Sequence, residues 1–258
     1  MSERSHLNVT LEDSVLRVVI DRPEKRNALS REVLEELRET FTRYADRSDL
    51  KVAVLRGAQH KSFAAGGDLR DLSTVRTRPE ATDMADRAKV CLDAIRSFPV
   101  PVVAALNGDA LGGGAELAVA CDLRVAAAHA RIGFVQGKLN ISTAWGGGID
   151  LMLLIGPARG LRLLASSALL DAESAHAMGL VDAVAGTDQD IDALIDEFIQ
   201  PCLGQTPQVL RAFKALAHGA RSGLPRRAME QLETERFGGT WIQDDHWAAA
   251  DRLLNSPR

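Results

Sequence analysis

Apolar and polar positions follow two different periods along the first 190 residues. The β-branched run Val15–Ile20 ends at the turn-forming Asp21–Pro23 and predicts a strand. Ser30 then has the character of a helix N-cap. The apolar positions from Val33 to Phe41 follow the helical spacing, so a strand followed by an amphipathic helix is expected here.

The same alternation continues through the middle of the chain. Further buried strands are predicted at Val52–Leu55, Val100–Leu106 and Leu123–Ala126. Helices are predicted for the apolar stripe from Met84 to Phe98 and for Ala115–Cys121, Leu151–Ile155 and Pro157–Leu164. Beyond about Ile191 the pattern is helical only. Strands alternating with helices, and then helices alone, predict an α/β core over residues 1–190 and a helical region over residues 191–258.

Composition and charge narrow the class of protein. The chain has 258 residues, 46% of them hydrophobic, which suits one large domain with a substantial core. The net charge of −4 and the lack of a dense Lys/Arg block disfavour a nucleic-acid partner. No window offers about 18 uncharged apolar residues, so no membrane partner is expected. The first 14 residues lack a secretion pattern, and a cytoplasmic location is the expectation.

Cysteines and histidines give no indication of a metal site. Three cysteines lie far apart in the chain, which predicts buried reduced thiols rather than a zinc site or a disulfide framework: Cys91, Cys121 and Cys202. Five histidines lack a Cys or Asp partner at ligand spacing and are expected at the surface or at helix caps: His60, His129, His176, His218 and His246. No bound metal is therefore expected.

Two glycine-rich turns dominate the candidate chemistry. Residues 63–69 (FAAGGDL) follow the strand Val52–Leu55, and residues 107–116 (NGDALGGGAE) follow the strand Val100–Leu106. Neither turn fits GxxxxGK[ST] or a GxGxxG strand-to-helix turn, which disfavours P-loop and Rossmann phosphate cradles. No GxSxG occurs, which disfavours a nucleophile-elbow hydrolase.

The second turn leads directly into a helix. Gly113 falls at a helix N-terminus, where N–H groups have no intrahelical partner and a missing side chain allows close approach of a ligand. Glu116 lies three residues on, on the same helix face. An anion-binding N–H and a carboxylate would then border one cavity. The alternative is that these glycines only permit tight helix–sheet packing and that Glu116 is a solvated first-turn acid.

These segments resemble a known family. FAAGGDL, NGDALGGGAELAVACDLRVA and GPARGLRLLASSALLDAESAHAMGLVDAV, together with RPEKRNALS near the N-terminus, resemble the enoyl-CoA hydratase/isomerase (crotonase) family over almost the whole chain, in order and at the usual spacings. The resemblance implies a ClpP/crotonase-like α/β fold, a spiral of strand–strand–helix units with a C-terminal helical region. It also implies an enzyme of fatty acid metabolism that acts on a short-chain acyl-CoA or enoyl-CoA, with coenzyme A as part of the substrate and no other cofactor.

The resemblance assigns roles to individual residues. The N–H groups of Gly67 and Gly113 are expected to bind the thioester oxygen as it gains negative charge, and Asp68 is expected to fix its own loop. Five residues are implied to lie along coenzyme A: Lys25, Arg26, Ala28, Ala65 and Leu69. Lys25 and Arg26 can equally be ordinary surface charge.

Two positions depart from the family pattern. Hydratases of the family place two glutamates around one water; Glu116 matches the first, but Gln136 stands at the second position. A glutamine can orient water but cannot exchange a proton, which argues against efficient hydration. Trp145 stands where common hydratases have a small residue and is expected either to narrow the acyl pocket or to pack in the core. WGG, LLDAESAHAMGLVD and RFGGTW are together similar to the ethylmalonyl-CoA decarboxylase branch.

Several functions therefore stay open. Within the family they are hydration of a 2-enoyl-CoA, decarboxylation of a 2-alkylmalonyl-CoA (ethylmalonyl- or methylmalonyl-CoA), and double-bond isomerisation with Glu116 alone shuttling the proton. A function of another class is a non-catalytic acyl-CoA-binding scaffold. The family also implies a homo-oligomer, a trimer or hexamer, in which Trp241 and Trp247 pack a subunit contact or a lid over coenzyme A.

Overall fold

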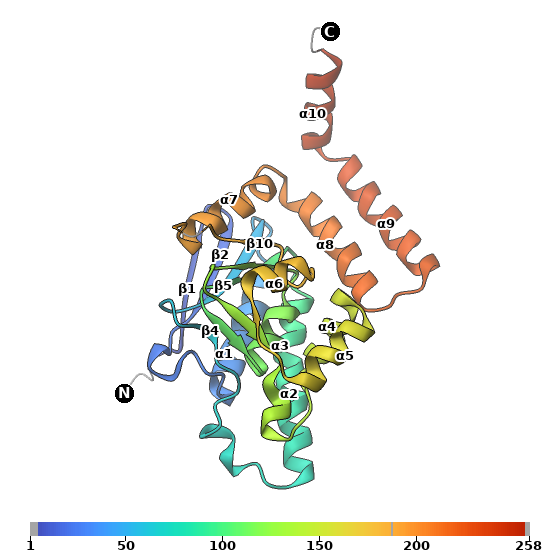
Figure 1. The fold of residues 1–258 in the computed structure, drawn as a ribbon. Helices are drawn as coiled ribbons and strands as arrows, with labels where there is room; N and C mark the ends of the chain where they lie inside the picture. The colour runs from blue at the N-terminus through green and yellow to red at the C-terminus, as the bar shows by residue number, and fades with distance from the viewer. Residues whose placement is uncertain (1–4, 187, 256–258) are drawn as a thin grey trace.

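Two β-sheets form the centre of the protein, and helices surround them (Figure 1). The computed structural model describes residues 5–186 and 188–255. Figure 1 shows α9 lying beside α8 and α10 extending away from the body. None of the helices in the described chain combines the length and apolar character needed to cross a bilayer.

The larger sheet has six strands in the order β1-β2-β3-β5-β7-β10. These are β1 Leu7–Glu12, β2 Val15–Ile20, β3 Val52–Gly57, β5 Val102–Leu106, β7 Leu123–Ala126 and β10 Ala183–Val184. β1 and β2 pair antiparallel, and the remaining pairs are parallel. β5 is buried along its whole length, as expected for a parallel strand covered on both faces, whereas β1 alternates and exposes one face.

The smaller sheet has four strands in the order β4-β6-β8-β9. These are β4 Ser62–Ala64, β6 Asp109–Leu111, β8 Arg131–Gly133 and β9 Leu170–Asp171. Three consecutive units, β3-β4-α2, β5-β6-α3 and β7-β8-α4, each place their first strand in the large sheet and their second in the small sheet. This is the spiral of strand–strand–helix units that the family resemblance implies.

The described residues form ten α-helices. They are α1 Arg31–Ala45, α2 Arg78–Arg96, α3 Gly113–Ala120, α4 Gly147–Ile155, α5 Pro157–Ser166, α6 Ala172–Ala177, α7 Ile191–Leu203, α8 Pro207–Arg221, α9 Arg226–Trp241 and α10 Asp244–Leu254, with short 3₁₀ helices η1 Pro23–Lys25, η2 Asp71–Thr74 and η3 Val135–Leu139. The Ser30 hydroxyl accepts a hydrogen bond from the Val33 N–H at 3.3 Å, so the predicted N-cap of α1 is confirmed.

The helical region does not separate sharply from the core. α7 packs Ile191, Ile195 and Ile199 into the same hydrophobic core as the sheets. α9 and α10 bury none of their described residues, and Trp241 and Trp247 contact each other with their ring centroids 5.8 Å apart. A division into a core over residues 1–190 and a helical region over residues 191–258 therefore stays a prediction.

Three helices begin earlier than the hydrophobic pattern predicts, and one of them is α2, which begins at Arg78 rather than Met84. α3 begins at Gly113 rather than Ala115, and α4 begins at Gly147 rather than Leu151. In both cases the first turn is glycine-rich, so apolar periodicity gives no signal there. The prediction of buried free thiols is confirmed for Cys91 and Cys121, whereas Cys202 is only partly buried.

Candidate active site

A cavity of about 160 Å³ opens where the two glycine-rich turns meet the segment before α4. Seven of the predicted site residues line it: Ala65, Gly67, Leu69, Gly113, Glu116, Gln136 and Trp145. They come from segments far apart in the chain, which the two sheets bring together. The other three predicted residues, Lys25, Arg26 and Ala28, are outside the cavity lining.

Pairing with the loop after β2 fixes the direction of the Gly67 N–H. The Gly66 carbonyl accepts a hydrogen bond from the Leu29 N–H at 2.8 Å, and the Asp68 N–H donates to the Leu29 carbonyl at 2.9 Å. Because a trans peptide points its N–H opposite to its carbonyl, the Gly67 N–H points away from Leu29. Within residues 5–186 and 188–255 it has no hydrogen-bond acceptor. Gly67 itself lines the cavity, so this free donor lies at the cavity wall.

Asp68 holds this turn in place, as the sequence predicts. Its buried carboxylate accepts a hydrogen bond from Arg22 Nη2 at 2.9 Å and one from the Arg70 N–H at 3.2 Å. Burial alone would raise the pKa of Asp68, but hydrogen bonds from Arg22 and the Asp71 N–H hold that pKa below its usual range. Asp68 is thus an ionised anchor whose position depends on Arg22.

Gly113 presents the second free N–H. It is the first residue of α3, after Gly112 with φ +53° and ψ −116°, a backbone conformation that favours glycine. The Gly112 carbonyl accepts the first helical hydrogen bond, from the Glu116 N–H at 3.0 Å. The Gly113 N–H therefore projects off the helix end, and it has no acceptor among the described residues.

The neighbouring Gly114 serves packing instead. A methyl group built on Gly114 would lie 2.0 Å from the Ala64 carbonyl oxygen, so α3 can approach β4 only with glycine there. The two interpretations of this turn therefore apply to different residues: Gly114 permits tight packing, and Gly113 borders the cavity.

One aromatic ring contacts both glycine turns. A methyl group built on Gly67 would lie 3.7 Å from Trp145 Cη2, and one built on Gly113 would lie 2.7 Å from the same atom. The two free N–H groups therefore belong to residues that both lie against the Trp145 ring. Trp145 is only 6% exposed, so it is both a core residue and a wall of the cavity.

Glu116 is the carboxyl group of this cavity. It is 2% exposed, so the alternative of a solvated first-turn acid is wrong. Its Oε2 accepts hydrogen bonds from the Trp145 N–H at 2.9 Å and the Gly147 N–H at 3.0 Å, and its Oε1 accepts one from Gln136 Nε2 at 2.9 Å. Burial raises the pKa of Glu116 above its usual range, although these hydrogen bonds oppose the rise.

Gln136 lies beside Glu116, on the 3₁₀ helix η3. It is 8% exposed and lines the cavity. Since its Nε2 donates to Glu116, its Oε1 is left as an acceptor, and this buried oxygen receives no hydrogen bond from the described protein. A buried acceptor without a donor is uncommon, so this oxygen is suited to a donor group on a substrate or a water.

The predicted coenzyme A residues near the N-terminus lie beside the first turn. Lys25 Nζ is 3.5 Å from the Asp68 carboxylate, and the Arg26 carbonyl accepts a hydrogen bond from the Ala65 N–H at 3.1 Å. The Ala28 carbonyl accepts one from Arg22 Nη1 at 2.6 Å. These contacts support the turn, and contact of these residues with coenzyme A stays a prediction.

Some residues of the site were not predicted from the sequence. Arg22, which anchors Asp68, lies within the N-terminal RPEKRNALS segment. Only Lys25, Arg26 and Ala28 of this segment were assigned a role from the sequence. Arg22 lies two residues after the buried strand β2 and directly before a proline, and this position was the available signal. Leu72, Met84 and Ile141 complete the apolar wall, and they come from segments with no motif.

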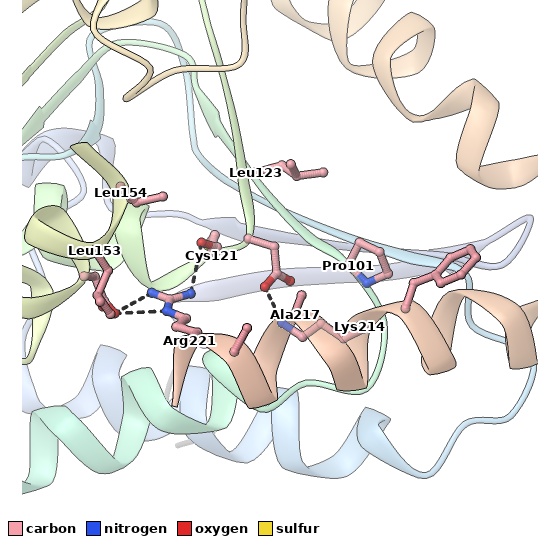
Figure 2. Close-up of a pocket in the computed structure, with 12 residues that line it drawn as sticks. Pro101, Cys121, Leu123, Leu153, Leu154, Lys214, Ala217 and Arg221 are labelled. Carbon is pink, nitrogen blue, oxygen red and sulfur yellow. Dashed lines mark hydrogen bonds and ion pairs between the residues drawn. The ribbon is translucent and has the colours of Figure 1, made fainter. Parts of the chain in front are cut away.

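Two other features lie outside this cavity. A larger cavity, of about 510 Å³, lies between α8 and the ends of β5 and β7 and contains none of the predicted site residues (Figure 2). His6, Glu32 and Glu36 form the single cluster of potential metal ligands in the described chain, but His6 Nδ1 is already 2.8 Å from a Glu36 oxygen as a hydrogen-bonded pair. None of these three residues lines the candidate site.

Comparisons with known proteins identify the family. The family described as Enoyl-CoA hydratase/isomerase matches residues 10–249. A crotonyl-CoA hydratase of Syntrophomonas wolfei is 30% identical over 91% of this chain and 89% of its own length. An ethylmalonyl-CoA decarboxylase of Xenopus laevis is 29% identical over 89% of this chain and 77% of its own length. The crystal structure of an enoyl-CoA hydratase from Bacillus anthracis is 27% identical, with a TM-score of 0.90 over 97% of this chain and 96% of that one.

The chain belongs to the enoyl-CoA hydratase/isomerase family and is an enzyme of that family. The expected crotonase fold is confirmed by the structural likeness over nearly the whole chain. Its relatives carry different names, hydratase and decarboxylase among them, so membership alone does not select the reaction.

Proposed function

We propose that this enzyme stabilises the enolate of a short-chain acyl-CoA thioester on the N–H groups of Gly67 and Gly113. Breaking a bond at the carbon next to a thioester leaves negative charge on the carbonyl oxygen. Two fixed donors aimed at that oxygen stabilise it without reorganisation, each by about 3–4 kcal/mol in comparable sites. The observation that carries the proposal is that two residues whose N–H groups have no acceptor among the described residues both lie against the Trp145 ring and line one cavity with the buried Glu116.

Glu116 is the proton-transferring group in this proposal. Its raised pKa places it closer to neutral pH, where a carboxyl group can both accept and return a proton. Gln136 cannot exchange a proton, so each proton transfer must use Glu116. The small cavity with its Trp145 wall favours a short acyl chain.

The specific reaction that we favour is decarboxylation of a 2-alkylmalonyl-CoA. Loss of carbon dioxide leaves the enolate directly, and a single protonated Glu116 can then deliver a proton to the α carbon. No Lys, Arg or His lines the cavity among the described residues, so a substrate carboxylate would be poorly solvated there, and release of neutral carbon dioxide relieves that cost. Gln136 in place of a second carboxyl supports this choice, because protonation of the enolate needs only the one proton donor, Glu116.

A parallel assay separates the reactions. The purified enzyme would be incubated with crotonyl-CoA, methylmalonyl-CoA and ethylmalonyl-CoA, and exchange of the α protons of butyryl-CoA in D₂O would be followed alongside. Exchange together with carbon dioxide release supports the decarboxylase, and exchange together with loss of enoyl absorbance identifies a hydratase instead. Binding of these esters without exchange or turnover would identify the non-catalytic scaffold and contradict the enolate proposal.

Installing a second carboxyl is expected to create or improve hydration. In Gln136→Glu the new carboxyl would lie within hydrogen-bond distance of Glu116, and two such carboxyls share one proton. We expect hydration of crotonyl-CoA to rise by about 10²-fold, within the usual range of acid–base help. Loss of the enoyl absorbance measures it, with the exposed Gln205→Glu as the matched control. An unchanged hydration rate in a folded variant would contradict the assigned role of position 136.

The family resemblance and the exposed apolar surface both favour a homo-oligomer, and we propose a trimer or hexamer without a cofactor other than the coenzyme A of the substrate. Large apolar side chains are exposed on the helical region, among them Phe213, Phe237, Ile242 and Leu253. An exposed apolar surface of this kind is typical of association sites. Light scattering of the purified chain should give three or six times 27.8 kDa, and a monomer at micromolar concentration would contradict this.

A further inference from the structure

The turn from Trp145 to Gly147 carries three features of the candidate site. Its two N–H groups at Trp145 and Gly147 donate to Glu116 Oε2, and the Trp145 ring lies against Gly67 and Gly113. The turn itself includes Gly146 with φ +90°, so its own backbone preference does little to fix it. Its position must come from the groups packed behind it.

Arg96, at the end of α2, contacts this turn from behind. Its Nη2 donates to the Trp145 carbonyl at 3.0 Å and to Asp150 Oδ2 at 2.8 Å, and its Nε donates to the same carboxylate oxygen at 3.0 Å. A methyl group built on Gly146 would lie 2.8 Å from Arg96 Nη2, so the guanidinium lies directly against the turn. The Arg96 side chain is only 12% exposed.

Asp150, in the first turn of α4, joins Arg96 to Arg221 of α8. It is 5% exposed, and its Oδ1 accepts a hydrogen bond from Arg221 Nε at 3.0 Å. Arg221 also donates to the Ala120 carbonyl at 2.9 Å and to the Val119 carbonyl, the last carbonyls of the helix that carries Gly113 and Glu116. Figure 2 shows the Arg221 side chain extending from α8 with a hydrogen bond to the Cys121 carbonyl, which follows α3 directly.

We propose that Arg96, Asp150 and Arg221 are positioning residues that hold the Trp145–Gly147 turn against Glu116. We call these three residues the clamp. The inference rests on the proposed function of Glu116 as the proton-transferring group. The hydrogen bonds of the clamp join the ends of α2, α3, α4 and α8. Separating these ends would leave a buried charge without its partner, which is strongly destabilising, so the clamp keeps them in one arrangement. Through the clamp, the position of α8 affects the position of the turn that hydrogen-bonds Glu116.

The clamp has a specific consequence for the proton affinity of Glu116. Hydrogen bonds from the Trp145 and Gly147 N–H groups favour the ionised form of Glu116 and counteract the effect of burial on its pKa. The other side chain bonded to Glu116 is the neutral amide of Gln136. If the turn shifts, those two backbone bonds weaken and the pKa of Glu116 rises further. A base with a higher pKa loses activity at a higher pH.

The test uses Asp150→Asn, which keeps the shape of the side chain and removes its charge. Exchange of the α protons of butyryl-CoA in D₂O is measured across pH in the full-length variant. We expect the acid limb of the rate profile to move up by about one pH unit, with about tenfold slower exchange below it. A merely structural role would lower the fraction of folded enzyme without moving the limb.

Asp93→Asn is the matched control. Asp93 also pairs with Arg96, at 2.6 Å, but its side chain is 67% exposed and it does not reach the turn. Its removal should leave the profile unchanged. If Asp150→Asn does not fold, Arg96→Lys provides the second variant. A lysine keeps the positive charge beside Asp150, but it lacks the planar guanidinium group that bonds Asp150 and the Trp145 carbonyl at the same time. The same upward shift is expected for it.

The outcomes separate the clamp from the proposed function. An unmoved acid limb in folded Asp150→Asn or Arg96→Lys, with Glu116→Gln still inactive, would overturn the clamp and leave the function of Glu116 intact. Activity retained in Glu116→Gln would instead overturn the proposed function itself. An acid limb that moves equally in Asp93→Asn would also overturn the clamp. The shift would then come from removing any negative charge near Arg96 and not from movement of the Trp145–Gly147 turn.

Discussion

Replacement of Glu116 by Gln is expected to slow α-proton exchange of butyryl-CoA by about 10²–10⁴-fold, the usual contribution of a positioned general base. The variant should keep its fold. The new amide oxygen can accept the Trp145 and Gly147 N–H bonds, and the Gln136 amide can turn so that its unpaired oxygen meets the new NH₂ group. Mass spectrometry of deuterium incorporation measures the rate.

Thermal unfolding of the same variant gives an independent check. Because burial raises the pKa of Glu116, the folded wild type carries a poorly solvated charge above that pKa. Glu116→Gln should therefore unfold at a higher temperature than the wild type near neutral pH, and the advantage should shrink as the pH falls through the raised pKa toward the usual glutamate range. Glu173→Gln, which replaces an exposed acid in the first turn of α6, is the control.

In the exchange assay, a Glu116→Gln rate within threefold of the wild-type rate would contradict the role of Glu116.

A methyl group at Gly113 is expected to abolish activity through Trp145. In Gly113→Ala the added carbon would lie 2.4 Å from Trp145 Cζ3, so the ring must move or the helix end must withdraw. Either change displaces the Gly113 N–H from the oxyanion position, and loss of one such donor costs about 10²–10³-fold in turnover. Exchange of the butyryl-CoA α protons again provides the rate.

Removing the ring in the same variant should restore activity in part. Gly113→Ala combined with Trp145→Ala relieves the collision, and we expect exchange to be about tenfold faster than in Gly113→Ala alone. Recovery is incomplete because the cavity without the Trp145 ring is wider and holds the substrate less precisely. Gly238→Ala on α9, where an added methyl group meets nothing within 4 Å, should leave the rate unchanged. If Gly113→Ala retains wild-type exchange, the N–H of residue 113 does not bind the thioester oxygen.

Periodicity predicted the four buried strands β2, β3, β5 and β7 of the large sheet, and it missed the half-exposed β1 and the short strands of the small sheet. β3 and β5 are continuous apolar runs and were expected, whereas β4, β6 and β8 are three residues each and too short for any period to appear. Those short strands carry the turns of the candidate site. The candidate site was therefore predicted from the glycine motifs and the family resemblance, and not from predicted secondary structure.

Burial and long-range charge pairing were beyond the sequence. Glu116 is three residues into a helix, where a solvated acid is equally reasonable, and only the packing of the Trp145–Gly147 turn over it removes it from water. Asp150 has its partners Arg96 and Arg221 at distances of 54 and 71 residues along the chain. Such pairs follow from tertiary contacts that a single sequence does not display.

The central claim is that the amides of residues 67 and 113 share one thioester oxygen. A crystal structure of the enzyme with bound butyryl-CoA tests it most directly. We expect the thioester oxygen to lie about 2.7–3.1 Å from both nitrogens, with its α carbon facing Glu116. A well-ordered ligand whose oxygen contacts one of these nitrogens or neither would contradict the account.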